Sequence, residues 1–181
     1  MNKKLFLLLL MASGLTAASA QVWVGGEMNY QMNSLHTNSS VTDTEHEFTF
    51  APEVGIDLNE KWGVAAQLKF EHGYDGNHNL TNTFGIRPYV RYYWGHYDKW
   101  HILTDGGLDF SSTHVCGNDK NINSFGLFIS PGVSYSLNDR FGLEAHFGNL
   151  NWTNRKADDL KENNFKLFFD TEFSIGFYVN L

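Results

Sequence analysis

The sequence predicts an all-β fold: an eight-stranded antiparallel up-and-down β-barrel (a meander) that spans a membrane and is preceded by a signal peptide. Three observations support this prediction. Segments of alternating apolar and polar residues recur along the chain, the N-terminus has the features of an export signal, and short connections alternate with long polar ones. Residues 1–20 are expected to be the signal peptide and residues 21–181 a single barrel domain.

The N-terminal residues have the parts of a secretory signal. Lys3 and Lys4 precede an apolar run over 5–11, and small residues over 18–20 mark the cleavage site. The run is shorter than the about 20 residues that a membrane-spanning helix needs, so we expect cleavage. Without Lys3 and Lys4, the 13 Lys and Arg residues fall to 11 against 20 Asp and Glu residues, a net charge of −9. This acidic balance argues against nucleic acid as a partner.

Eight segments alternate with a period of two, which is typical of strands because successive side chains point to opposite faces. They cover 22–31, 47–58, 62–71, 84–94, 100–110, 124–137, 140–148 and 165–181. In the last segment, the odd positions from Phe165 to Leu181 include four phenylalanines and no charge, whereas the even positions carry two acids and a lysine. The apolar face is free of charge in every segment.

These faces predict that lipid lies outside the barrel. A soluble barrel with a ligand cavity would have an apolar interior and a polar exterior, the reverse of this pattern. Only a closed sheet can face lipid, because an open edge would leave backbone groups unpaired there. Each segment is close to the about 9–11 residues that a tilted strand needs to cross a bilayer, and an even number of strands permits closure with both ends on one side.

The connections and the aromatic residues predict the orientation. Short connections cover 59–60, 95–99 and 138–139, and long polar ones cover 33–45, 72–82, 112–123 and 150–164. Short periplasmic turns and long extracellular loops are typical of outer-membrane barrels, so both mature termini are expected in the periplasm. Aromatic girdles are expected at the lower interface (Trp62, Tyr92, Trp94, Trp100, Tyr135, Phe141) and at the upper one (Phe48, Phe70, Phe84, Phe110, Phe125, Phe147).

A hairpin motif repeats within the chain. Residues 51–64 align with 130–143, and each contains a strand, an Asn-acid turn and a returning strand. The three prolines, Pro52, Pro88 and Pro131, all lie on the apolar face of strands that descend to a short turn. Proline removes a donor from the strand ladder, so we expect gaps in the ladder at one height, which would help to set curvature and register.

The proline-containing hairpins and the terminal strand over 173–181 resemble the small eight-stranded outer-membrane β-barrel family of OmpA- and OmpX-like proteins, in its Bacteroidetes-type branch. The resemblance covers the whole mature chain and implies a bacterial outer-membrane location with lipid and lipopolysaccharide as neighbours. It also implies recognition of the terminal strand by the barrel-assembly machinery. Some members of this class modify lipid A, but here Gly148 occupies the position where the deacylase motif would have a serine after His146. We therefore expect no enzyme activity.

The inward face is rich in charge and predicts the contents of the lumen. An eight-stranded barrel is just wide enough for side chains to fill, and buried charges require partners. We therefore expect a polar network that seals the lumen, with Arg91 bridging Glu144 and the Glu27/Glu53 pair and with Lys69 and Arg87 above them. The candidate network comprises Glu27, Glu53, Lys69, Arg87, Arg91, Asp105, Glu144, His146 and Glu172.

The functional prediction is a non-enzymatic barrel whose extracellular loops serve surface interaction, adhesion or envelope integrity. A small ion-conducting pore is the first alternative, and a lipid A-modifying enzyme is the second. We expect a monomer without cofactor or metal, and an extracellular partner that the sequence does not identify. Five histidines near the expected extracellular end follow no metal-ligand spacing: His36, His46, His72, His78 and His114. Cys116 is expected to be a free thiol, with intermolecular pairing as the alternative.

Overall fold

The computed structural model describes the backbone of residues 21–37, 40–74, 80–116, 121–157 and 160–181. Within these ranges it describes the side chains except at 31–37, 40–45, His96, Asn149, 155–157 and 160–173. No helix among the described residues is long and apolar enough to cross a membrane.

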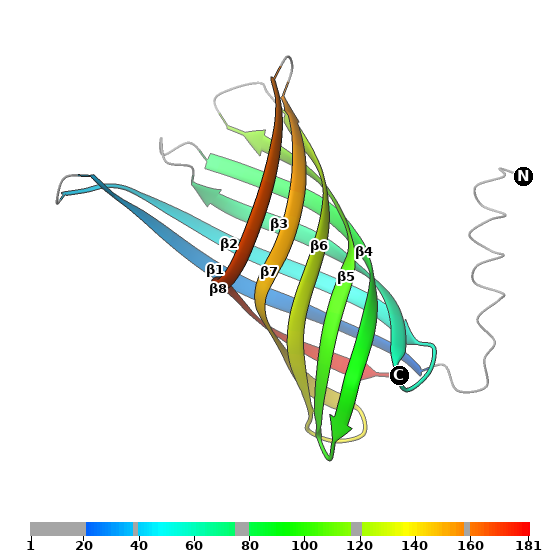
Figure 1. Ribbon diagram of the computed structural model, residues 1–181. Helices are drawn as coiled ribbons and strands as arrows, with labels where there is room; N and C mark the ends of the chain where they lie inside the picture. The colour runs from blue at the N-terminus through cyan, green and yellow to red at the C-terminus, as the bar shows by residue number, and fades with distance from the viewer. Residues whose placement is uncertain (1–20, 38–39, 75–79, 117–120, 158–159) are drawn as a thin grey trace, which may run out of the picture.

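Eight antiparallel strands close into one barrel in chain order, as the alternating segments predict (Figure 1). The strands are β1 (Gln21–Thr37), β2 (Ser40–Asp57), β3 (Trp62–Tyr74), β4 (Leu80–Tyr97), β5 (Trp100–Val115), β6 (Asn121–Ser136), β7 (Phe141–Ala157) and β8 (Leu160–Asn180). Each strand pairs with its neighbours in sequence, and β1 pairs with β8 to complete the barrel. The two ends of the barrel sequence, Gln21 and Leu181, lie at the end that carries the short turns (Figure 1).

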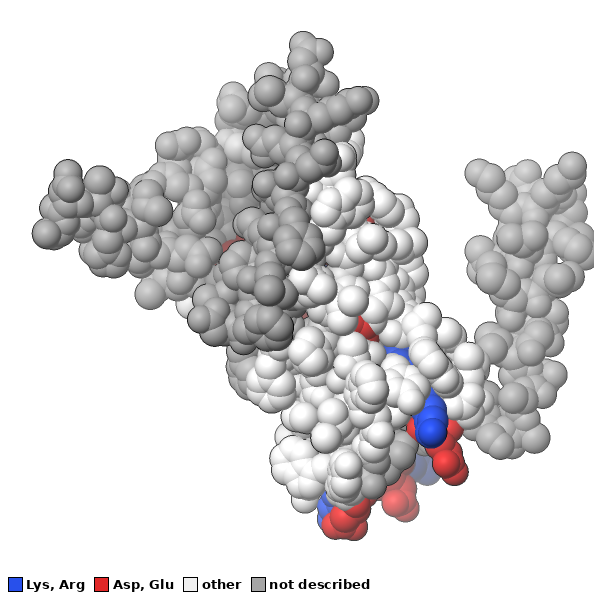
Figure 2. Space-filling model, in the orientation of Figure 1, with Lys and Arg blue, Asp and Glu red and all other residues white. Residues whose placement is uncertain are grey.

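The outer surface carries large apolar side chains. Trp94 is 66% exposed and Phe84 53% exposed, whereas the inward-facing Trp23 is only 2% exposed. Neighbouring strands place aromatic rings in contact at both predicted girdles, with 4.6 Å between the ring centroids of Trp62 and Tyr92 and 5.2 Å between those of Phe110 and Phe125. Figure 2 shows an almost uncharged flank, with acidic and basic side chains gathered at the short-turn end.

The repeated Asn-acid hairpin forms two equivalent turns. The Asn59 side-chain oxygen accepts hydrogen bonds from the backbone N–H groups of Lys61 (2.9 Å) and Trp62 (3.0 Å). The Asn138 oxygen accepts the corresponding bonds from Arg140 and Phe141, both at 2.9 Å. These turns are formed locally, because an asparagine side chain can satisfy the N–H groups two and three residues ahead of it.

The strand ladder is interrupted beside each proline. Between β2 and β3 the pairs Phe50↔Phe70 and Glu53↔Gln67 are separated by an unpaired step next to Pro52. The β4–β5 ladder has the same gap next to Pro88, and the β6–β7 ladder shifts register next to Pro131. The prediction of ladder gaps at the prolines is therefore confirmed, and their contribution to curvature stays a prediction.

The four long polar connections are shorter than their predicted bounds. Most residues of the four segments 33–45, 72–82, 112–123 and 150–164 belong to strands that continue past the expected ends, with β1 paired to β2 out to Thr37↔Ser40 and β7 paired to β8 out to Ala157↔Leu160. The polar composition of these segments suggested loops, but strands can continue through polar residues when the neighbouring hairpin strand supplies the backbone partners. The chain therefore projects paired hairpins where loops were expected.

Two of these hairpins separate from the barrel at the β1–β8 seam. The β1–β8 ladder ends at Met28↔Ile175, whereas β1 continues to pair with β2 and β8 with β7. The β1–β2 and β7–β8 hairpins diverge in Figure 1. Both hairpins are two-stranded ribbons, and in the β7–β8 ribbon Phe165 pairs with Trp152. The position of the bilayer relative to these ribbons stays a prediction.

Candidate functional site: the barrel lumen

Arg91 of β4 is the central cation of the lumen and is 2% exposed. Its Nε and Nη2 donate to the two oxygens of Asp105 on β5, at 2.9 and 2.8 Å. Its Nη1 donates to Glu144 Oε2 on β7 at 2.9 Å. The guanidinium carbon also lies 4.8 Å from the ring centroid of Trp23 on β1. The planar guanidinium group of Arg91 therefore binds two carboxylates from different strands and stacks on a side chain from a third strand.

The partners of Arg91 differ in part from the sequence prediction. The bond to Glu144 is as expected, but the second carboxylate is that of Asp105, and Glu27 and Glu53 bind other groups. The reason is register, because Arg91 and Asp105 face each other directly in the β4–β5 ladder. Inward side chains on directly opposed positions are the closest cross-strand neighbours.

Glu53 of β2 is held by neutral donors. Its Oε2 accepts hydrogen bonds from the Tyr89 hydroxyl at 2.8 Å and from Gln67 Nε2 at 3.2 Å. Tyr89 also accepts a weaker bond from Arg91 Nη2 at 3.3 Å, so Glu53 is connected to the cation through the tyrosine.

His146 of β7 lies between two carboxylates. Its Nε2 is hydrogen-bonded to Asp105 Oδ2 at 3.0 Å. Its Nδ1 is 3.0 Å from Glu27 Oε1, but the atoms lack the alignment of a hydrogen bond. Glu27 Oε2 accepts a hydrogen bond from the Ser174 hydroxyl of β8 at 2.9 Å. These contacts connect β5, β7, β8 and β1 at one height in the barrel.

Lys69 and Arg87 lie nearer the end of the barrel that carries the ribbons. Lys69 Nζ lies 2.6 Å from Glu71 and 3.8 Å from Asp109, and Arg87 Nε lies 3.4 Å from Asp109. Arg87 also donates to Gln67 at 3.2 Å, and its guanidinium carbon lies 3.9 Å from the centroid of the Phe128 ring. Both cations therefore pair with Glu71 or Asp109 and not directly with the middle carboxylates, and Arg87 is connected to Glu53 through Gln67.

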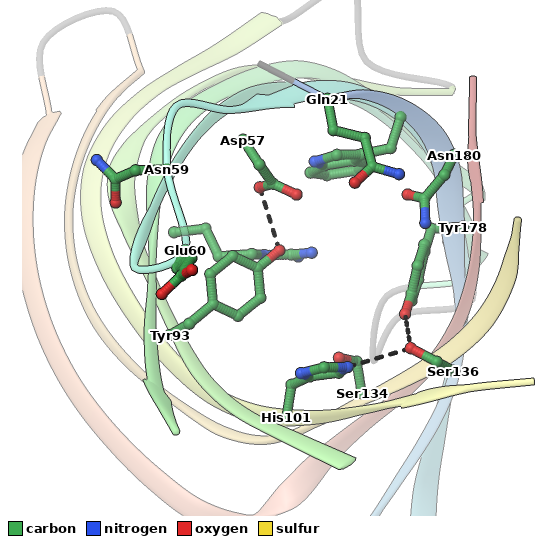
Figure 3. Close-up of a pocket in the computed structure, with 12 residues that line it drawn as sticks. Gln21, Asp57, Asn59, Glu60, Tyr93, His101, Ser134, Ser136, Tyr178 and Asn180 are labelled. Atoms are coloured by element: carbon green, nitrogen blue, oxygen red, sulfur yellow. Dashed lines mark hydrogen bonds between the residues drawn. The ribbon is translucent and has the colours of Figure 1, made fainter. Parts of the chain in front are cut away.

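Two cavities enter the lumen from opposite ends and do not meet. The one at the short-turn end has a volume of about 340 Å³, and Figure 3 shows Tyr93 bonded to Asp57 and His101 bonded to Ser136 within it. The one at the other end has a volume of about 130 Å³ and includes Glu27 and His146 in its lining. No described residue lines both cavities. Buried Trp23, Leu103 and Phe128 lie in the lumen with the charged network.

Several of these side chains are not members of the predicted network. Tyr89, Gln67 and Ser174 each hold a carboxylate, and Asp109 binds both upper cations. Alternation placed all four on the inward face, but their partners depend on the closed barrel. Glu172, which the sequence analysis included, has a side chain outside the described residues.

The expected metal-free state of the histidines in the four long connections and beside them stays a prediction. Among those with described side chains, His46 is hydrogen-bonded to Tyr30 (2.8 Å), His72 to Asn82 (2.7 Å) and His114 to Asn121 (2.9 Å). The side chains of His36 and His78 lie outside the described residues. Cys116 is a free cysteine, and its sulfur accepts a contact from Asn82 Nδ2 at 3.7 Å.

A closed antiparallel barrel with an apolar exterior and a charged, packed interior defines the class of bacterial outer-membrane β-barrels. The chain belongs to the family described as the outer membrane protein beta-barrel domain, whose model matches residues 5–173. The protein is therefore an outer-membrane β-barrel. No curated protein matches the chain.

Solved structures with the same fold include two bacterial barrels. Neisserial surface protein A has a TM-score of 0.64 and 17% sequence identity, over 90% of this chain and 99% of that one. The N-terminal β-barrel domain of Pseudomonas aeruginosa OprF has a TM-score of 0.50 and 12% identity, over 88% of this chain and 97% of that one. At these identities, the similarity establishes the fold.

Proposed function

We propose that this protein is a non-enzymatic surface barrel that presents the β1–β2 and β7–β8 ribbons to the exterior for surface interaction or envelope integrity. The observation that carries the proposal is the register of the seam, because the β1–β8 ladder ends at Met28↔Ile175 while both hairpins continue well beyond it. The closed barrel fixes where the ribbons emerge, and binding residues are commonly displayed on segments that such a scaffold positions. In this proposal both mature termini are periplasmic.

The contents of the lumen support a structural rather than a conducting role. The Arg91 network lies between two cavities with no shared lining residue, so an ion would have to displace buried charge pairs. The exterior wall also supports a non-enzymatic role. Thr104, an outward hydroxyl, accepts a hydrogen bond from Trp94 at 2.9 Å, and the buried His146 points inward. We also propose that the barrel is a monomer, that it contacts lipopolysaccharide in the membrane, and that the barrel-assembly machinery recognises it during insertion.

Shortening a ribbon tests this proposal. A variant in which Gln31 is joined to Glu47 by an Asn-Gly turn keeps every β1 residue that pairs with β8, and it should fold because such turns favour hairpins. Cells carrying the full-length protein should bind extracellular-matrix or serum proteins, or resist detergent, better than cells carrying the shortened barrel. Equal behaviour of the two strains and of a strain without the protein, at equal surface levels, would overturn the proposal.

A further inference from the structure

Three potential metal ligands converge where the barrel closes. Glu27 of β1 and Glu144 of β7 both pair with Gly176 of β8, so the three positions lie at one height on adjacent strands. A Cβ atom at position 176 would lie 3.0 Å from Glu27 Cγ and 3.1 Å from Glu144 Cγ. Glycine at this position therefore leaves the space into which the two carboxylates approach each other. His146, two residues after Glu144, completes the cluster.

The geometry of the cluster suits a cation. One ligand atom from each of Glu27, Glu144 and His146 lies within 4.8 Å of the other two. Glu144 and His146 are 2% and 5% exposed, and neither Glu144 Oε1 nor His146 Nδ1 has a hydrogen-bond partner. Buried polar atoms without partners are uncommon in native structures and require an explanation. Glu144 Oε1 and His146 Nδ1 both belong to the cluster, and Nδ1 lies 3.0 Å from Glu27 Oε1 as an ion pair.

The surrounding groups would orient these ligands. Asp105 is hydrogen-bonded to His146 Nε2, which leaves Nδ1 to face the cluster, and a carboxylate behind a histidine is the usual support of a metal-bound imidazole. Ser174 holds the other oxygen of Glu27, and Arg91 holds the other oxygen of Glu144. Each proposed ligand therefore has one atom held by another side chain, and His146 Nδ1 and Glu27 Oε1 face each other at 3.0 Å.

Charge and access also favour a cation. The middle of the lumen holds the carboxylates of Glu27, Glu53, Asp105 and Glu144, and its cationic or potentially cationic neighbours are Arg91, His146 and Arg87. A divalent ion would offset more of this negative charge than a protonated imidazole. Glu27 and His146 line the cavity that opens toward the ribbons, so an ion from that side can reach them.

We propose that Glu27, Glu144 and His146 bind a divalent transition-metal ion of the zinc class at the β1–β8 seam. One imidazole nitrogen with two carboxylates suits such ions, whereas Mg²⁺ and Ca²⁺ prefer oxygen ligands alone. The ion connects β1 to β7 across β8, at the pair that precedes the last pair of the β1–β8 ladder, Met28↔Ile175. It therefore strengthens the closure of the barrel. The competing occupant is a proton shared between Glu144 and the neighbouring Glu53 carboxyl.

Zinc titration of the refolded, chelator-treated barrel tests the proposal. Wild type should bind one more Zn²⁺ ion than the variants Glu27→Gln and His146→Gln, and Zn²⁺ should raise its unfolding temperature but not theirs. Glu71→Gln is the matched control, because Glu71 lines the same cavity but pairs with Lys69. This control should bind Zn²⁺ like wild type. Loss of a ligand should weaken binding about tenfold or more.

A second measurement locates the ion in the wild-type protein, so the test does not depend on the folding of a variant. Co²⁺ is paramagnetic and binds to nitrogen and oxygen sites of this kind. It should broaden the NMR signals of Ser174 and Gly176 before those of His46, His72 and His114. Equal zinc stoichiometry in all variants, or broadening confined to the extracellular histidines, would overturn the proposal and leave the shared proton as the occupant.

Discussion

Replacing Arg91 by alanine removes the central cation of the lumen. The Arg91 side chain is 2% exposed and binds Asp105 and Glu144, whose side chains are 6% and 0% exposed. Asp105 keeps His146 as a partner in the variant, whereas Glu144 Oε2 loses its cation. Breaking a buried ion pair by removing one partner costs roughly 3–5 kcal/mol, because the other charge is stranded. We therefore expect Arg91→Ala to lower the free energy of unfolding by about this amount.

Urea titration of the barrel in lipid vesicles, followed by tryptophan fluorescence, measures this loss. A cost of roughly 3–5 kcal/mol changes the unfolding equilibrium by about two to four orders of magnitude. The double variant Arg91→Ala/Glu144→Gln should recover part of the loss, because it removes the stranded charge. Arg140→Ala is the control, since Arg140 is exposed at a turn and such a change usually costs less than about 0.5 kcal/mol.

The same variant tests whether the lumen is sealed. Wild type should conduct poorly in a planar bilayer, and Arg91→Ala should conduct better because the two cavities are then separated by fewer side chains. A stability loss under about 1 kcal/mol for Arg91→Ala would refute the network as a buried, cooperative unit. Large steady conductance of the wild type, unchanged in the variant, would instead support the pore.

Two further predictions concern topology and packing. With Cys116 replaced by serine, a cysteine at Lys156 should react with a membrane-impermeant reagent on intact cells and one at Asn138 should not; labelling at Asn138 would reverse the proposed orientation. A Cβ at Gly55 would overlap the ring of the inward-facing Trp23, so Gly55→Leu should displace this ring, shift tryptophan fluorescence and lower the unfolding midpoint. An unchanged emission spectrum and midpoint would show that the ring has room to move.

The strand count, the outward and inward faces, the aromatic pairs and the Asn turns could all be predicted from the sequence. These features depend on local properties: a strand alternates its side chains with a period of two, and an asparagine bonds to the N–H groups just ahead of it. Strand β7 is longer than the predicted segment 140–148, because the pattern on which that prediction depends changes at Gly148. Gly148, with φ of 76°, lies at a register shift between Phe147 and Asn149, and beyond it Leu150 pairs with the outward Ile129. The outward positions therefore change from odd to even numbers after Gly148, so the period-two pattern is interrupted there although the strand continues.

Which charged side chains pair with each other depends on the tertiary structure. Arg91 and Asp105 are paired by the β4–β5 register, and Arg91 reaches Glu144 across the lumen from a strand that is distant in sequence. The cluster of Glu27, Glu144 and His146 likewise depends on β8 lying between β1 and β7 with Gly176 level with both acids. Register and closure are set by the whole sheet, so no local pattern in the sequence specifies these partners.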